Sequence, residues 1–356
     1  MYDVVIVGAG PSGATLARLI GNRFRVLLID KRQLLDEKNG TDEKCCGGLI
    51  APDAQYMLGK LGLGVPKRVL VGPQLFTVRT MDLQSNIERY YQRHYINIDR
   101  GKFDSWLVSL IPPSVDIRCG SQFKTFERTG GNFNIKLIYD GKEYIERARI
   151  LVGADGAFST VRRQLAPLLF QKKYVAIQEW YKVQDTLPYF SAIFDSEITD
   201  FYSWTIPKED YLLVGAAVPV KENVGYKYNL LKKKLSTCGF ELKTLVKKHG
   251  CYIIRPETGA QIYLGESNVM FIGEAAGWIS PTSAEGLSYS FRSALALAKS
   301  LKSKSENYLS DYIQNTKGLK FNIFTKNLKA PFMYNPLIRG LVMKTGISSM
   351  NMIDSD

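Results

Sequence analysis

Three glycines near the start of the chain have the spacing of a turn that binds a diphosphate. Gly8, Gly10 and Gly13 form the pattern G-x-G-x-x-G between an apolar run, YDVVIV, and a stretch with helical spacing, ATLARLIGN. Glycine lets the backbone turn tightly and approach a phosphate, and the first amides of the next helix stabilise the negative charge. The residues predicted to form this cradle are Gly8, Gly10, Pro11, Ser12, Gly13 and Ala14.

An acidic residue stands where such a unit binds ribose. Asp30 ends a second apolar run, FRVLLID, and is followed by Lys31. In a unit of strand, turn, helix and strand, an acid roughly 20 residues beyond the glycines accepts hydrogen bonds from the adenosine ribose. Asp30 and Lys31 are therefore predicted to contact a dinucleotide, but this fingerprint alone does not separate FAD from NAD.

Two later segments decide between these dinucleotides. ILVGADGAFSTVRR, residues 150–163, resembles the second dinucleotide-contact motif of the p-hydroxybenzoate-hydroxylase-like flavoproteins, and MFIGEAAGWISPTSAEGLSYSFRSA, residues 270–294, resembles their flavin-ribityl motif. The resemblance spans most of the chain, and within this superfamily it is to the geranylgeranyl reductase branch. It implies that FAD is the cofactor. The contacts that it implies in these two segments are with Asp155, Gly156, Gly273 and Glu274.

The ribityl segment departs from the family at one position and suits a reduced flavin at another. An aspartate usually stands in the family where this chain has Glu274, whose longer side chain must reach the ribityl hydroxyl by a different path. Pro281 and Gly286 frame a loop before a helix, and the first amides, at Gly286 and Leu287, can stabilise charge at the flavin N1–C2 carbonyl edge. The alternative is that Gly286 and Leu287 only begin the helix.

A cysteine pair and an arginine are implied to lie beside the flavin ring. The stretch CCGG resembles the C-G-G motif of geranylgeranyl reductases, which implies that Cys46, Gly47 and Gly48 contact the isoalloxazine. Cys46 then acts as a proton donor or a substrate contact, or is merely a small apolar residue. INIDRGKFDSWL resembles an R-x-x-F-D segment that offers Arg100 to the cofactor, and the alternative is a surface ion pair with Asp104.

Two aromatic residues are candidates for the substrate side. The stretch TDFYSWTIPK resembles the P-x-x-Y-x-W-x-F-P signature of the branch through Tyr202, Trp204 and Pro207, while Thr199 and Ile206 depart from it. Residues two apart on a strand face the same side, so Tyr202 and Trp204 are predicted to line one wall of a pocket. The alternative is that both rings belong to the core of a sheet.

The expected chemistry is that of the flavin. The chain has two histidines, no C-x-x-C and no second G-x-G-x-x-G, so a metal site, Ser-His-Asp catalysis and a resident NAD(P) domain are not expected. NAD(P)H or another reductant is expected to act as a transient electron donor. The CCGG and YSWTIP resemblances imply a reductase that transfers hydride from reduced FAD to a C=C bond of an isoprenoid or other hydrophobic substrate.

Two alternatives to the reductase stay open. The same cofactor, with NAD(P)H and oxygen, serves a monooxygenase that hydroxylates its substrate in a water-free pocket. The other alternative is a membrane-peripheral flavoprotein in which FAD is structural or supports a reaction without net redox change.

The charge of the chain also needs an explanation. The 356 residues carry a net charge of +13, and the excess gathers at residues 232–234, at Lys247 and Lys248, and along residues 317–344, where basic and apolar residues alternate. This tail is predicted to be either a solvated basic face over a helical cap or a contact with an anionic membrane surface. Nucleic acid is not expected, since no nucleic-acid-binding motif accompanies the charge.

The same composition predicts where the protein works. No apolar run approaches the roughly 20 residues needed to span a bilayer. Five cysteines without a secretion signal do not suggest a disulfide framework. A cytoplasmic location is therefore expected, with membrane association on the cytoplasmic face as the extension that the basic tail suggests.

The elements that must position these residues predict an α/β protein of composite α+β architecture. A Rossmann-type FAD-binding domain, an inserted antiparallel β-sheet substrate domain and a C-terminal helical segment are expected, and the strand VMFIGEAAG returns the chain to the first domain. The predicted boundaries are 1–70, 98–172 and 254–300 for the FAD-binding domain, 71–97 and 173–253 for the substrate domain, and 301–356 for the C-terminal segment.

Local patterns predict several elements within these domains. Residues 115–152 alternate polar and apolar side chains around two Gly-containing hairpin signals, which predicts a three-stranded antiparallel meander. Residues 174–220 are rich in aromatic and β-branched side chains, which predicts a mostly antiparallel sheet. Two basic helices are predicted after it, at about residues 226–236 and 241–249.

Overall fold

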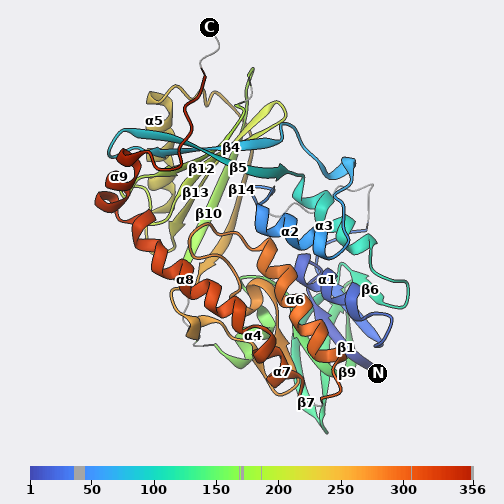
Figure 1. The fold of residues 1–356 in the computed structure, drawn as a ribbon. Coiled ribbons are helices and arrows are strands. Elements are labelled where there is room, and N and C mark those ends of the chain that lie inside the picture. Colours follow the sequence, from blue (N-terminus) through green and yellow to red (C-terminus); the bar gives the residue numbers. More distant parts are fainter. Residues whose placement is uncertain (36–44, 168, 170–171, 186, 306, 354–356) are drawn as a thin grey trace.

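The computed structural model describes residues 1–35, 45–167, 169, 172–185, 187–305 and 307–353. These residues form two large β-sheets, one in the lower half and the other in the upper half of the view in Figure 1, with helices packed beside them. Residues of both sheets line one cavity, which is the candidate site.

The first sheet contains the Rossmann-type unit. Its strand order is β15-β16-β9-β1-β2-β6, and β1 pairs in parallel with both β2 and β9. The central strands β1 and β2 are continuous apolar runs and are almost entirely buried, as is usual for the strands of a parallel sheet. Its strands are β1 Tyr2–Val7, β2 Val26–Asp30, β6 Asp116–Cys119, β7 Gln122–Thr129, β8 Asn132–Tyr139, β9 Lys142–Gly153, β15 Gly265–Glu266 and β16 Val269–Phe271.

The predicted antiparallel meander is confirmed. β7 pairs with β8 and β8 with β9, each antiparallel, and the turns fall at the two hairpin signals. The strand signal just before the meander belongs to β6, which instead pairs in parallel with β2. β9 therefore links the meander to the parallel core, since its second half lies beside β1.

Helices cover this first sheet and close its core. α1 packs against α6, and both contribute small and aliphatic side chains to the buried cluster around β1. Tyr312 of α7 is fully buried and donates a hydrogen bond of 3.0 Å to the carbonyl oxygen of Phe271. The helices of this half are α1 Pro11–Ile20, α2 Pro52–Lys60, α3 Arg100–Ser109, α4 Thr160–Leu165, α6 Leu287–Lys302 and α7 Tyr308–Asn315.

The second sheet is mostly antiparallel, as predicted. Its order is β14-β10-β13-β12-β11-β4-β5-β3, and only the pair of β11 with β4 is parallel among its described pairings. The predicted helix at 226–236 is α5, Val224–Thr237, which buries Tyr228, Leu231 and Leu235 against one face. The strands are β3 Leu49–Ile50, β4 Leu75–Asp82, β5 Ile87–Asn97, β10 Lys172–Lys182, β11 Phe190–Phe194, β12 Ser203–Lys208, β13 Tyr211–Pro219 and β14 Thr244–Arg255.

The prediction of a second basic helix at 241–249 is wrong. These residues lie largely in β14, which pairs antiparallel with β10 from Thr244 to Arg255. β14 is an edge strand of its sheet, so the lysines that suggested a helix have room in solvent on the strand. Pairing with β10 satisfies the backbone of this segment, and such tertiary pairing overrides a weak local preference for helix.

The C-terminal segment is helical, as predicted, and is anchored to the second sheet. The guanidinium of Arg255 lies between the rings of Phe201 and Tyr334, 4.7 and 4.5 Å from their centroids. Nε of Arg339 donates a buried hydrogen bond of 2.9 Å to Asp82. The remaining helices are α8 Lys317–Tyr334, α9 Pro336–Thr345 and the short 3₁₀ helices η1 Lys67–Val69, η2 Gly259–Gln261 and η3 Gly273–Ala276.

No helix in the described part of the chain has both the length and the apolar character to cross a bilayer. The strands of the second sheet come from segments before α3 and after α4, so the chain leaves the first sheet and later returns to it through β15 and β16. The predicted domain boundaries themselves stay a prediction.

Candidate functional site

A large cavity lies between the two sheets. Its volume is about 1340 Å³, which exceeds the range of roughly 300–1,000 Å³ that is usual for a pocket holding one small ligand. One part of its wall comes from the glycine-rich turn after β1 and from the segment after β9, and another comes from the strands of the second sheet. The cavity therefore brings together the two sets of residues that the sequence analysis assigned to cofactor and substrate.

The glycine-rich turn has the backbone geometry of a phosphate cradle. A methyl group on Gly8 would lie 2.4 Å from the Ala154 carbonyl oxygen, and one on Gly13 would lie 1.8 Å from the Gly8 carbonyl oxygen. These two glycines thus allow strand, turn and helix to pack closely. Gly10 differs, because a methyl group placed on it would have no atom of the described residues within 4 Å apart from its chain neighbours, and it lines the cavity. Space above Gly10 is what a bound phosphate requires.

The first amides of α1 are available to an anion. Gly10 precedes the helix without a side-chain cap, and Pro11 occupies the first turn, where its missing N–H costs nothing. The amides of Ser12 and Gly13 have no acceptor within the helix because they belong to its first turn. Pro11 and Ser12 line the cavity. The residues present therefore fit a diphosphate group.

Asp30 lines the cavity, but its carboxylate is already surrounded by donors. Oδ2 accepts hydrogen bonds from the amide of Ala9 at 2.7 Å and from Arg32 Nη2 at 3.1 Å. Oδ1 accepts from the amide and Nε of Arg32, at 2.8 and 3.1 Å. A carboxylate has about four acceptor sites, so a ribose hydroxyl must share Asp30 with Arg32. Lys31 also lines the cavity and is exposed.

Arg32, Asp104 and Arg100 form consecutive ion pairs in the half of the molecule that contains the glycine-rich turn and the first sheet. Nη1 of Arg32 donates to Asp104 Oδ2 at 2.8 Å, and Oδ1 of the same carboxylate accepts from Arg100 Nε at 2.8 Å. Burial acts to lower the pKa of Arg100, but its charge interactions and hydrogen bonds with Asp104 and Cys46 together outweigh burial and raise the pKa. The predicted pair of Arg100 with Asp104 exists, but it is buried and not on the surface. Arg32 was missed by the sequence analysis, although its position after Asp30 was a signal.

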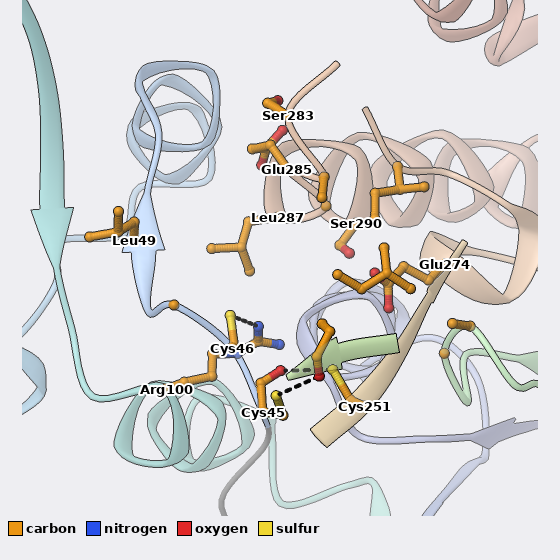
Figure 2. A pocket seen from close by; sticks show the side chains of 18 of the residues that line it. Cys45, Cys46, Leu49, Arg100, Cys251, Glu274, Ser283, Glu285, Leu287 and Ser290 are labelled. Atoms are coloured by element: carbon orange, nitrogen blue, oxygen red, sulfur yellow. Dashed lines mark hydrogen bonds between the residues drawn. The ribbon is translucent and has the colours of Figure 1, made fainter. Parts of the chain in front are cut away.

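The same arginine reaches the CCGG loop. Arg100 Nη1 donates to the sulfur of Cys46 at 3.3 Å, and the amide of Gly48 donates to it at 3.5 Å. Figure 2 shows Cys46 and Arg100 joined by this hydrogen bond, with Leu287 on another wall of the cavity. Cys46, Gly48 and Arg100 all line the cavity. Arg100 thus pairs with Asp104 and also lies at the cavity, while its contact with the cofactor stays a prediction.

A buried lysine binds the backbone of the CCGG loop. Nζ of Lys208 donates to the carbonyl oxygens of Gly48 at 3.1 Å and Ile98 at 2.8 Å. Burial lowers the pKa of Lys208 to about 7. The sequence analysis missed this role, and the only signal was a lysine at the end of an apolar strand. Gly47 also lines the cavity, and a methyl group on it would lie 2.6 Å from Ile206.

Asp155 has one satisfied and one unsatisfied carboxylate oxygen. Oδ2 accepts from the amides of Thr160 at 2.7 Å and Val161 at 3.3 Å, at the start of α4. Oδ1 is buried and has no hydrogen-bond partner among the described residues. Burial raises the pKa of Asp155. Asp155 and Gly156 line the cavity, so a ligand hydroxyl or amide there would satisfy an otherwise costly orphan acceptor.

The loop before α6 is held by the second sheet and by α8. The hydroxyl of Tyr202 donates to the Ser283 carbonyl oxygen at 2.8 Å, and that of Tyr334 donates to Thr282 at 2.6 Å. Within the loop, Glu285 accepts from the amide and hydroxyl of Ser288. Burial raises the pKa of Glu285, a residue that the sequence analysis did not single out.

The predicted ribityl residues converge on this loop. Glu274, Gly286 and Leu287 line the cavity, and a methyl group on Gly286 would lie 3.6 Å from Glu274 Oε1. Gly286 begins α6 without a side-chain cap. The longer acid at position 274 therefore reaches the start of α6, and Gly286 begins that helix at the cavity wall. The contact of Gly286 with the flavin stays a prediction.

Tyr202 and Trp204 form an aromatic wall. Their ring centroids lie 5.4 Å apart, and both line the cavity. Trp204 is also buried in the core of the second sheet, so it belongs to wall and core at once. A methyl group on Gly215 of the neighbouring strand would lie 2.4 Å from the Trp204 indole. Trp204 Nε1 is buried without a partner among the described residues, which leaves a donor available for a ligand.

Three predicted cofactor residues do not line the cavity. Gly13 and Ala14 lie behind the cradle in α1, where Gly13 contacts Gly8. A methyl group on Gly273 would lie 2.6 Å from Ser12 Oγ, so Gly273 packs the ribityl segment against α1. These three residues let the segments around the site pack closely, but they do not themselves line the cavity. Among the described residues no group of side chains has the composition of a metal site.

Comparison with curated proteins identifies relatives along nearly the whole chain. Protein CbrA of Escherichia coli O9:H4 (strain HS) is 40% identical over 349 residues, which cover 98% of this chain and 94% of that protein. The chain belongs to the CbrA family. No known family model matches it.

The CbrA-family chain also shares its fold with solved structures. A geranylgeranyl bacteriochlorophyll reductase-like protein from Thermoplasma acidophilum has a TM-score of 0.80, with 18% identity, over 97% of this chain and 90% of that chain. PqsL from Pseudomonas aeruginosa, a probable FAD-dependent monooxygenase, has a TM-score of 0.70, with 17% identity, over 97% and 99%. Identity this low shows the fold alone, and the predicted fold class is thereby confirmed for this member of the CbrA family.

Proposed function

We propose that this CbrA-family protein is an FAD-dependent oxidoreductase. One observation carries the proposal: the same cavity joins a diphosphate cradle, at Gly8, Gly10 and Ser12, to an aromatic wall at Tyr202 and Trp204. A dinucleotide on the cradle can therefore bring its reactive end to a substrate held on the wall. The fold shared with a reductase-like protein and a probable FAD-dependent monooxygenase supports the same proposal.

The residues present fit FAD. The amides that open α1 suit its diphosphate, and the unpaired Oδ1 of Asp155 offers an acceptor to a hydroxyl. Gly286 and Leu287 place the start of α6 at the cavity, where backbone donors stabilise negative charge. FAD supplies hydride chemistry when it is bound, and the protein supplies its position and electrostatics.

The substrate side favours a largely apolar molecule. The cavity wall formed by the second sheet is mostly hydrophobic, with the unpaired Nε1 of Trp204 as a buried donor. Such a wall excludes water and binds apolar surface. We propose that the substrate is an isoprenoid or another hydrophobic molecule and that hydride is added to one of its C=C bonds. The apolar side chains of this wall include Val78, Phe190, Ala192, Phe194, Trp204 and Ile206.

Saturating a C=C bond requires a proton as well as a hydride. Cys46 bears an exchangeable proton at the cavity wall, and Arg100 and the Gly48 amide orient its sulfur. We therefore propose Cys46 as the proton donor. Lys208 and Arg100 act through this loop, since each of them binds an atom of residues 46–48.

The proposal is tested first by the visible spectrum of the purified protein and by its uptake of added FAD. A flavin spectrum, reduction by NAD(P)H or a chemical reductant, and anaerobic reoxidation by a polyprenyl lipid are expected. Properly folded protein that neither contains nor takes up FAD would contradict the oxidoreductase. Reduced protein that no polyprenyl lipid reoxidises would contradict the reductase alone.

A monooxygenase is the second candidate, because PqsL shares the fold over nearly its whole length. The same water-excluding wall serves that reaction. The two candidates differ in their use of oxygen. Substrate-stimulated oxidation of NAD(P)H with isotope from labelled oxygen in the product would establish the monooxygenase, whereas turnover without oxygen would establish the reductase.

A further inference from the structure

The helix α8 carries two apolar stripes, of which only one is buried. Ile323 faces the interior and is fully buried. Phe321, Phe324, Leu328 and Phe332 are instead 55–67% exposed. Their spacing of three and four residues places them along one side of the helix. Single exposed apolar residues are ordinary, but a row of four large ones marks a surface for interaction.

The exposed stripe continues on α9. Leu337 and Leu341 are 80% and 67% exposed and lie four residues apart, hence on one side of that helix. Figure 1 shows α8 and α9 in succession along one edge of the molecule. The name C-terminal apolar face is used below for this set: Phe321, Phe324, Leu328, Phe332, Leu337 and Leu341.

The charged residues of the two helices that carry this face all have one sign. Residues 317–345 contain no aspartate or glutamate. Lys317, Lys329 and Lys344 are exposed. On the helical wheel of α8, Lys320 and Lys329 fall on opposite flanks of the apolar stripe. Large apolar side chains between lysines are the arrangement of a helix that lies in the interface of an anionic bilayer.

The cavity reaches the surface at the same place. Phe332 and Val342 are 58% and 48% exposed, yet both line the cavity, and so do their neighbours Met333 and Met343. A side chain that is exposed and also lines a cavity stands at an opening. α8 and α9 therefore carry the C-terminal apolar face and also form a mouth of the candidate site.

We propose that the C-terminal apolar face rests on an anionic lipid bilayer and that the cavity mouth at Phe332 and Val342 opens toward that bilayer. An apolar substrate then passes from lipid into the cavity without crossing water, which keeps its apolar surface covered throughout. The route for the substrate rests on the proposed function. The binding of lipid does not, because it needs only the side chains of the face.

Binding is tested with the full-length protein and two kinds of vesicle, phosphatidylcholine alone and phosphatidylcholine with phosphatidylglycerol. Cosedimentation with the anionic vesicles is expected, and it should weaken as salt is raised because the lysine contribution is screened. The combined substitution Phe324→Gln, Leu328→Gln and Leu337→Gln should weaken binding by about tenfold or more. Lys320→Gln and Lys329→Gln should each weaken it by about fivefold.

A matched control comes from β14. Leu245 and Val246 are 50% and 55% exposed on the edge strand, so Leu245→Gln with Val246→Gln removes exposed apolar surface elsewhere. This control should bind anionic vesicles as the wild type does. Apart from the half-buried Lys320, these side chains are exposed, so the unfolding midpoint should stay near that of the wild type for each variant, which separates lost binding from lost folding.

The orientation of the cavity mouth is tested by how deeply a residue at the mouth enters the bilayer. A tryptophan introduced by Phe332→Trp should be quenched by lipids with brominated chains, and one introduced by Val246→Trp should not, each measured against the fluorescence of the wild type. Quenching of neither would overturn the orientation, and so would quenching of both.

Equal binding of the triple variant and the wild type to anionic vesicles would overturn the proposal. So would self-association of the wild type that the triple variant lacks, because the face would then belong to a second copy of the chain. A protein that binds vesicles but takes up no FAD would contradict only the proposed function. A protein that takes up FAD but binds no vesicles would contradict only this inference.

Discussion

Nη1 of Arg100 donates a hydrogen bond of 3.3 Å to the sulfur of Cys46, 54 positions earlier in the chain. The same guanidinium binds the fully buried Asp104 through Nε at 2.8 Å. Asp104 in turn accepts from Arg32. One buried chain of contacts therefore connects the end of β2 with the CCGG loop, and its parts respond together to substitution.

Replacing Arg100 should destabilise the fold. Arg100→Met leaves Asp104 buried with Arg32 as its remaining guanidinium partner, and breaking a buried pair in this way costs about 3 kcal/mol of unfolding free energy. Arg100→Lys keeps the charge but not the planar fork, so its loss should be smaller. Urea unfolding measures both. A loss below about 1 kcal/mol for Arg100→Met would mean that this ion pair contributes no more than an exposed one.

Alanine substitutions at two glycines of the cradle should have different effects. Gly13→Ala places a methyl group 1.8 Å from the Gly8 carbonyl oxygen, so it should lower the unfolding midpoint. Gly10→Ala meets no atom within 4 Å, so the fold should remain while FAD affinity falls by about tenfold or more. Thermal unfolding and FAD titration separate the two effects. Unchanged FAD affinity in Gly10→Ala would place the diphosphate elsewhere.

Lys208 should make stability depend on pH. Its pKa is about 7 in the folded protein and about 10.4 in an unfolded chain. Between these values the unfolded state binds the extra proton, so the unfolding free energy should rise with pH, by up to about 1.4 kcal/mol per pH unit. Urea unfolding from pH 6.5 to 9.5 should show this rise in the wild type and a smaller one in Lys208→Met. Identical slopes in both proteins would rule out Lys208 as its source.

The indole N–H of Trp204 should matter for the ligand and not for the fold. Trp204→Phe removes a buried donor that has no partner among the described residues, so the unfolding free energy should change by less than about 1 kcal/mol from hydrogen bonding. If Nε1 donates to the substrate, KM should rise by about fivefold to tenfold. Steady-state kinetics of Trp204→Phe and Trp204→Tyr, compared with the wild type, measure this change in KM. A KM equal to that of the wild type would show that Nε1 faces no substrate acceptor.

Substitution of Cys46 should slow the reduction of the substrate and leave the reduction of FAD unchanged. Cys46→Ala removes the proposed proton donor and should slow turnover by about 100-fold, a typical contribution of general acid catalysis. Cys46→Ser keeps an exchangeable proton and should lose less. Reduction of FAD by the electron donor should be unaffected, as stopped-flow absorbance can show. Equal turnover in Cys46→Ala and the wild type would assign the proton to another group.

Much of the first sheet could be predicted from the sequence, because its turns and strands follow from patterns of neighbouring residues. The spacing of Gly8, Gly10 and Gly13 between an apolar strand and a helix predicts the turn, and the structure places that turn at the cavity. The hairpins of the meander follow in the same way from turn residues and alternation. Such patterns report the conformation of neighbouring residues, which the chain expresses wherever it folds.

The segment at 241–249 shows where local rules fail. Its lysines and leucine suit a helix, but pairing with β10, some seventy positions earlier, makes it a strand. The contacts of Lys208 with Gly48 and Ile98 have the same origin, since they join residues more than a hundred positions apart. No periodicity within a short window can carry that information.

The sequence by itself therefore determined the glycine-rich turn, the antiparallel meander and the segments that reach the site. Only the tertiary structure decided that Arg100 meets Cys46, that Asp30 is shared with Arg32, and that α8 and α9 expose an apolar face beside the cavity mouth. The physical reason is that turns and caps depend on a few adjacent residues, whereas ion pairs and exposed faces depend on how distant segments pack.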